Sequence, residues 1–141
     1  MVLASAGRIL MRVTSAFFVS ALTRRIFSDG GFAAVVSHGA DEAGAIYFTL
    51  RDRMGQVTLY GPAPQSAYDE RKPDERLFRL MLKEAEDEAV EAKLARERRF
   101  DPDVWVLDVE LGSKGIDDYI ALVKDSDAVQ ARGDSRSSNN K

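Results

Sequence analysis

The sequence predicts an α+β domain: a small, mainly antiparallel sheet of four to five strands with two or three helices packed on one face. Three patterns predict it: a β-hairpin signature at residues 44–62, two segments with helical periodicity, and a strand-like alternation at 104–111. The predicted order is helix, three strands, a fourth strand, helix and strand. That order is typical of α+β domains.

The first helix is expected to begin after Thr14 and Ser15, two residue types that cap helix N-termini well. The apolar residues that follow share one side of a helical wheel: Phe18, Val19, Leu22 and Ile26. Arg24 and Arg25 lie near its C-terminal end, where positive charge is favourable to the helix dipole. The two glycines at 30–31 are a stop signal.

A strand is expected at residues 32–38, a short apolar run that follows the two glycines. The hairpin comes next, with strands near 45–52 and 56–61. Both strands are rich in aromatic and β-branched residues, and they flank a short polar loop that contains Gly55. This pattern is typical of an antiparallel hairpin, and Pro62 ends its second strand.

Residues 74–82 fit two patterns. An alternation of apolar residues favours a strand: Phe78, Leu80 and Leu82. A helical stripe is the alternative: Leu77, Leu80 and Met81. We expect the strand. A helix is predicted at 84–99, because acidic residues crowd its start and arginines its end, the charge order that suits a helix dipole.

The last predicted strand spans residues 104–111, and its two faces differ. One face is uniformly apolar: Trp105, Leu107, Val109 and Leu111. The other face carries Val104, Val106, Asp108 and Glu110. Because side chains alternate along a strand, we expect the first set to face the core. A short helix is expected at 116–123.

A single domain at residues 11–123 holds all of these elements. Residues 1–10 are predicted to be a flexible extension, with Met11 preferred over Met1 as the start, and the polar residues 124–141 a disordered tail. No apolar run reaches the ~20 residues needed to cross a bilayer. The lack of cysteine excludes disulfides and suits a cytoplasmic location. The net charge of −3 argues against a general nucleic-acid binder.

No catalytic constellation or metal site is recognised, and no cofactor is expected. The densest carboxylate group comes late: Asp101, Asp103, Asp108 and Glu110. Carboxylates could ligate a divalent cation or act as general acid and base, but their spacing is not that of a calcium loop. A helix stop at Asp101 and solvent-facing strand positions are the simpler interpretation. The single histidine, His38, is expected to face water at a strand end.

The best binding candidate is the loop at residues 62–69, whose prolines restrict its backbone. Aromatic and polar side chains in and beside it could contact a ligand or partner: Tyr60, Gln65, Ser66 and Tyr68. Arg24 and Arg25 could add phosphate-binding groups. The alternatives are a loop that only carries the chain across the sheet, and arginines paired with neighbouring acids.

Several stretches resemble a family of small, mainly alphaproteobacterial proteins known as domain of unknown function 1491. They occur in the family's order: Phe17-Phe18-Val19-Ser20-Ala21-Leu22, Arg24-Arg25, Gly30-Gly31-Phe32-Ala33-Ala34-Val35, Ala43-Gly44-Ala45-Ile46, Leu59-Tyr60-Gly61-Pro62-Ala63-Pro64-Gln65 and Arg99-Phe100-Asp101-Pro102-Asp103-Val104-Trp105-Val106. The resemblance covers residues 11–111. It implies a bacterial cytoplasmic protein and a family start near Met11, and it implies no activity.

These observations favour a non-enzymatic protein that acts through protein–protein contact, with itself (as a homodimer) or another protein as partner. A small open sheet leaves edges that self-association can cover. The aromatic anchors expected in core and interface are Trp105, Phe48, Tyr47 and Tyr60. The alternative is a module that binds a small molecule or nucleic acid through residues 62–69 and nearby arginines. An enzyme that uses the late carboxylates ranks last. Neither a membrane nor nucleic acid is the expected partner.

Overall fold

The computed structural model describes residues 13–64 and 75–123 of the chain. Their elements are, in order, α2 (Ser15–Ser28), β1 (Phe32–Ser37), β2 (Ile46–Arg51), β3 (Val57–Pro62), β4 (Leu77–Ala85), α3 (Asp87–Phe100), β5 (Trp105–Glu110), the 3-10 helix η2 (Ile116–Asp118) and β6 (Ala121–Leu122). The predicted extension at 1–10, the predicted tail at 124–141 and most of the loop at 62–69 lie outside the described residues.

The α+β class is confirmed, but the sheet is larger and more mixed than the sequence predicted. Its six described strands have the order β1-β5-β2-β3-β4-β6. The hairpin β2–β3 is antiparallel as predicted, and so are β3–β4 and β1–β5. The pairs β2–β5 and β4–β6 are parallel. The difference arises because β5 enters between β1 and β2, a long-range pairing that local patterns do not encode.

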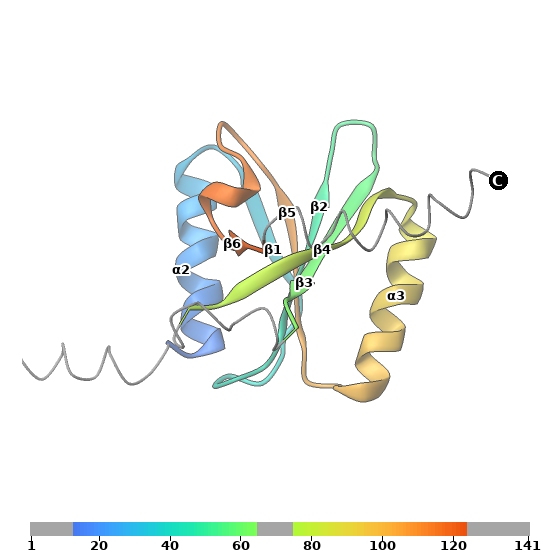
Figure 1. The fold of residues 1–141 in the computed structure, drawn as a ribbon. Coiled ribbons are helices and arrows are strands. Elements are labelled where there is room, and N and C mark those ends of the chain that lie inside the picture. The colour runs from blue at the N-terminus through green and yellow to red at the C-terminus, as the bar shows by residue number, and fades with distance from the viewer. Residues whose placement is uncertain (1–12, 65–74, 124–141) are drawn as a thin grey trace, which may run out of the picture.

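The helices lie on opposite faces of the sheet, so the prediction that they share one face was wrong (Figure 1). The physical reason is that the central strands carry apolar side chains on both faces. In β5, Leu107 belongs to the cluster under α2, whereas Val106 belongs to the cluster under α3. Each face then needs a helix to exclude water.

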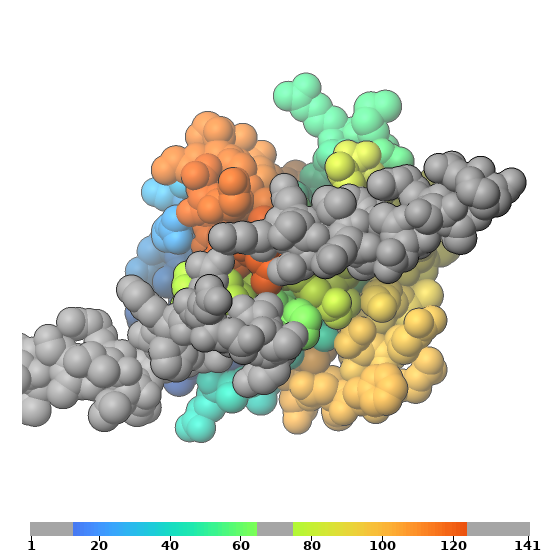
Figure 2. Space-filling view, viewed as in Figure 1, coloured from blue at the N-terminus to red at the C-terminus, as the bar shows by residue number. Residues whose placement is uncertain are grey.

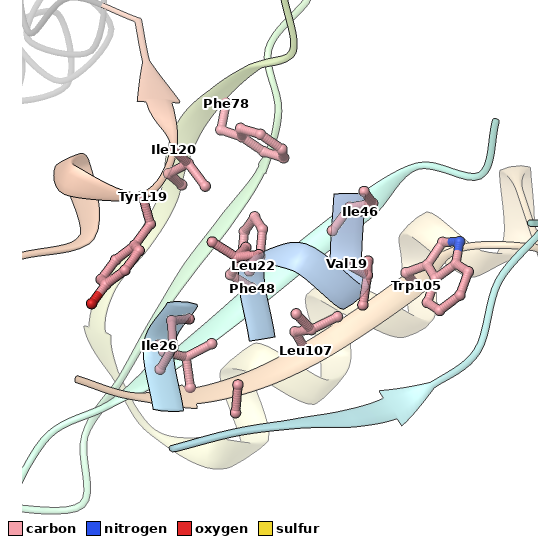
Figure 3. Close-up of a cluster of buried hydrophobic side chains, with 12 residues drawn as sticks. Val19, Leu22, Ile26, Ile46, Phe48, Phe78, Trp105, Leu107, Tyr119 and Ile120 are labelled. Carbon is pink, nitrogen blue, oxygen red and sulfur yellow. The ribbon is translucent and has the colours of Figure 1, made fainter. Parts of the chain in front are cut away.

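The larger cluster lies between α2 and the sheet (Figure 3). Phe48 of β2 and Leu107 of β5 are completely buried at its centre. Phe48 meets Phe78 of β4 edge-on, with ring centroids 5.1 Å apart. The predicted apolar stripe of α2 packs here, and Tyr119 and Ile120 close the far side.

The smaller cluster lies between α3 and the other face and includes Val90 and Leu94 of the helix. Tyr47 crosses this face and donates a hydrogen bond from its hydroxyl to Glu97 Oε1 at 3.1 Å. Its ring lies against Gly61, where a Cβ atom would come within 2.7 Å of the ring. Glycine is therefore needed at 61 to let the ring pack directly on β3.

Several local predictions are confirmed by the structure. Thr14 caps α2 by accepting a hydrogen bond from the backbone N–H of Phe17 at 3.1 Å. In the ambiguous segment at 74–82, residues 77–82 belong to strand β4, and the predicted helix at 84–99 is α3, which begins at Asp87. The helix expected at 116–123 was wrong, since only residues 116–118 form a 3-10 turn before β6.

Trp105 connects the core to the loop before β2. It is 3% exposed, and its indole N–H donates to the carbonyl oxygen of Ala40 at 2.8 Å. Its backbone N–H donates to the carbonyl oxygen of Ala45 at 2.7 Å. His38 lies over the indole, with ring centroids 4.1 Å apart. One residue thus binds the loop before β2 at two points, Ala40 through its side chain and Ala45 through its backbone.

We expect Trp105→Ala to lower the free energy of unfolding by about 3–5 kcal/mol, because it leaves a cavity and an unsatisfied carbonyl. The measurement is urea unfolding followed by far-ultraviolet circular dichroism. Phe100→Ala is the matched control, since Phe100 is 82% exposed and its loss should change stability by less than about 0.5 kcal/mol. Equal effects of the two substitutions would contradict the core role of Trp105.

Candidate protein contact site

The structure describes three of the six binding residues predicted from the sequence. Tyr60 is half-buried on β3, and Arg24 and Arg25 are exposed on α2. Gln65, Ser66 and Tyr68 lie outside the described residues. The proposed ligand loop therefore stays a prediction.

Arg25 is engaged within the protein at the junction of α2 and η2. Its guanidinium donates to the carbonyl oxygen of Asp118 at 2.9 Å and lies over the ring of Tyr119, 5.0 Å from the ring centroid. The Tyr119 hydroxyl donates to Asp29 Oδ2 at 2.6 Å, and Lys114 lies 3.7 Å from the same oxygen. Figure 2 shows this segment after β5, in orange, against the blue helix α2. These contacts give Arg25 a structural role, since its guanidinium holds the segment after β5 against α2.

Burial and neighbouring carboxylates raise the pKa of three tyrosines in the described part of the chain. The hydrogen bond to Asp29, with burial as the second cause, raises the pKa of Tyr119 to about 12. Burial, followed by the negative charge of Glu97, raises the pKa of Tyr47 to about 12. Burial and the charge of Asp117 also raise the pKa of Tyr60. All three phenols are thus neutral at physiological pH, and act as hydrogen-bonding or packing groups.

The late carboxylates do not assemble into a site. Asp101 accepts a hydrogen bond from the backbone of Asp103, and Asp108 accepts one from the hydroxyl of Thr49 at 2.9 Å. Among the described residues, no group of three or more histidine or carboxylate side chains is arranged to hold a metal ion. His38 is exposed and lies 3.1 Å from Asp41. Asp101, Asp108 and His38 are thus each engaged in a local contact.

The aromatic anchors expected from the sequence are mostly core residues. Trp105, Phe48 and Tyr47 are buried, and of the four anchors only Tyr60 is half-buried. The exposed large apolar side chains are elsewhere. Four of them gather around the first strand: Phe27, Phe32, Val35 and Val36. They are between 44% and 64% exposed, and the Phe27 and Phe32 rings meet edge-on with centroids 5.5 Å apart.

We call residues 32–36 of β1 the β1 edge. Within the described part of the chain, β1 pairs with β5 on one side and with no strand on the other. Its pairing with β5 is regular from Phe32 to Val35, and a bulge at Val36 follows. The β1 edge carries no charge and no proline, two of the features that protect exposed edges from unwanted pairing, and its bulge lies at its end, after the regular part at residues 32–35.

The opposite edge of the sheet has features that commonly protect edge strands against pairing with another chain. The short β6 pairs only with Leu77 and Phe78, which leaves the rest of β4 at the margin. That part of β4 carries exposed charges at Arg79, Lys83 and Glu84, and its pairing with β3 is irregular. Glu84 also has a positive φ of 49°. Charge, irregular register and backbone distortion all disfavour the addition of another strand there.

The β1 edge was missed as a site because the sequence shows only an apolar strand at 32–38. An apolar run of this length is equally typical of a strand buried at the centre of a sheet. Its exposure follows from its position at the margin of the sheet, which local patterns do not reveal. The absence of charged residues over 32–37 was the one available signal.

A family model described as "Protein of unknown function (DUF1491)" matches residues 13–115. The chain belongs to the DUF1491 family. The resemblance identified from the sequence is thereby confirmed.

Solved structures of related proteins agree with this family assignment. The solution structure of Atu0922 from Agrobacterium tumefaciens is 48% identical, with a TM-score of 0.69 over 81% of this chain and 97% of that one. A crystal structure of a DUF1491 family protein from Caulobacter crescentus is 30% identical, with a TM-score of 0.58 over 70% and 87% of the two chains. No curated protein matches the chain.

The DUF1491 assignment leaves the biochemical function open, so the site must be argued from its own geometry. The family description names no activity, ligand or partner. In the described part of this family member, none of the helices has the length and apolar character required to span a membrane.

The raised tyrosine pKa values predict how stability depends on alkaline pH. An unfolded tyrosine ionises near pH 10, whereas Tyr119 and Tyr47 ionise near pH 12 when folded. Their contribution is therefore complete below pH 10 and is lost as the pH rises towards 12. We expect Tyr119→Phe to flatten this fall in the free energy of unfolding and to remove one late step from the tyrosinate absorbance titration. An unchanged titration would contradict the Asp29 hydrogen bond.

Proposed function

We propose that this DUF1491 family member is a non-enzymatic protein that acts through protein–protein contact, with a second copy of itself as partner. The observation that supports this most directly is the β1 edge, which has no strand beside it among residues 13–64 and 75–123, is uncharged and is flanked by exposed apolar side chains. Exposed apolar surface gathered at one place is typical of a protein contact site. The nearby Phe27 of α2 extends this surface beyond the strand.

Electrostatics favour self-association at this place over a highly charged ligand. The chain has a net charge of −3, which disfavours close approach of two copies except through an uncharged surface. The β1 edge is such a surface. The alternative, phosphate or nucleic-acid binding through the arginines, has less support because Arg25 is already bound to Asp118 and Tyr119.

The proposed setting is the bacterial cytoplasm. A chain without cysteine gains no stability from an oxidising compartment, and the two named relatives come from bacteria.

Light scattering on the full chain tests this function. We expect a native mass of twice the chain mass of 15.6 kDa, and the same mass at low and high salt because the interface is apolar. Val36→Lys should convert the dimer to a monomer, since a lysine on an edge strand opposes pairing. Val36 is 64% exposed, so the fold should tolerate the change.

Met54→Lys is the matched control. Met54 is 84% exposed at the tip of the β2–β3 hairpin, away from the β1 edge, and the same change of charge there should leave the dimer intact. A wild-type chain that remains a monomer at high concentration would overturn the proposal. So would a dimer that Met54→Lys dissociates and Val36→Lys does not.

A further inference from the structure

We propose that β1 pairs in antiparallel fashion with β1 of a second copy, about a twofold axis at Ala34, so that two sheets become one. This inference rests on the self-association proposed above and specifies its geometry. The other modes of association, through a helix face or through Phe27 alone, would leave the backbone groups of the β1 edge unpaired.

The open side of β1 supplies the hydrogen-bonding groups for this pairing. Alternate residues of a strand direct their N–H and C=O groups to opposite sides, so the side of β1 away from β5 carries a row of them. An added strand satisfies that row with backbone hydrogen bonds. No side chain of the β1 edge is charged, so one copy of the edge can lie against another without repulsion.

Symmetry restricts the register. A twofold axis that pairs two antiparallel edges in one sheet must be perpendicular to that sheet. Rotation about this axis keeps each side chain on its own face of the sheet. Residues that lie opposite each other in an antiparallel pair also point to the same face, so their numbers differ by an even count. One residue must therefore lie opposite its own copy. In the five-residue β1 edge, the central residue is Ala34.

Pairing about Ala34 covers the exposed side chains of the edge. It sets Ala33 opposite Val35 of the second copy twice, once on each side of the axis, within the regular part of the strand, and brings Phe32 near the bulged Val36. Phe32 and Val36 are 48% and 64% exposed in the single chain. The small side chain of Ala34 lets the strands approach at the centre.

Neither helix obstructs the approach. Val35 is in register with the buried Leu107, so it points to the α2 face, yet it is 44% exposed. The helix α2 therefore leaves Val35 of the edge accessible. On the other face, α3 contacts β3 and β4, at the distant side of the sheet.

On the neighbouring strand β5, the charged residue nearest to the twofold axis is Asp108. Its two copies lie too far apart to repel each other strongly. Asp108 is in register with Ala34 on the neighbouring strand β5. In the paired sheet the two copies of Asp108 are three strand spacings apart, about 14 Å. That exceeds the Debye length of about 8 Å at physiological salt, so their repulsion is largely screened.

Cysteine cross-linking of the full chain tests the register cleanly, because the natural chain has no cysteine. Ala34→Cys places two thiols opposite each other at a Cα separation of about 4.5–5.5 Å, within the range of a disulfide. In Val35→Cys, the two thiols are offset along the strands, with Cα atoms about 8 Å apart, outside that range. Met54→Cys controls for random collision.

Under air oxidation we expect Ala34→Cys to form covalent dimers at least about tenfold faster than Met54→Cys, because its thiols meet within one complex. Val35→Cys should react no faster than Met54→Cys. Circular dichroism confirms that each variant is folded, and light scattering gives its mass under reducing conditions.

The outcomes separate this geometry from the proposed function. A dimer by light scattering in which Ala34→Cys reacts no faster than Met54→Cys would overturn strand pairing and leave self-association standing. Faster reaction at Val35→Cys than at Ala34→Cys would overturn the register. A folded chain that is a monomer would overturn both proposals.

Discussion

The fold depends on the insertion of β5 between β1 and β2. This strand pairs in antiparallel fashion with β1 and in parallel with β2, and it contributes apolar side chains to both clusters. The core under α2 therefore cannot be completed until residues beyond 104 have joined residues 32–50. Such pairing closes a long loop and costs chain entropy. The free energy gained by burying side chains such as Leu107 and Val106 must exceed that cost. Trp105 stabilises the point of entry through Ala40 and Ala45.

β1 lies at the margin of the same sheet. Within the described residues, β5 lies on one side of it and no strand lies on the other. The exposed Val35 and Val36 belong to this marginal strand. The segment after β5 then returns to α2, where Tyr119 and Asp29 hold it through a short hydrogen bond. The closing segment secures the C-terminal end of α2 and, in the part of the chain that the structure describes, does not pair with the β1 edge.

Local features of the fold could be predicted from the sequence, and long-range features could not. The Thr14 cap, the hairpin and the charge order of α3 are encoded within a few residues, so their patterns identified the elements correctly. The position of β5 and the side on which α3 packs depend on contacts between distant segments. The apolar face of β5 was identified, but the burial of Val104 and Val106 on its other face was not. The candidate site followed the same division: the strand at 32–38 was predicted, and its exposure was not.

An open apolar edge raises the question of why assembly would stop at two copies. Short uncharged segments rich in alanine and valine are prone to continuous strand addition. Twofold pairing of β1 uses both open edges at once and leaves only the opposite margins of the joined sheet free. Those margins carry the two-residue strand β6 and the charged, irregular part of β4 with Arg79 and Lys83. Neither margin complements the β1 edge or itself. The contrast between the two margins of one sheet therefore favours a closed pair over an extended assembly.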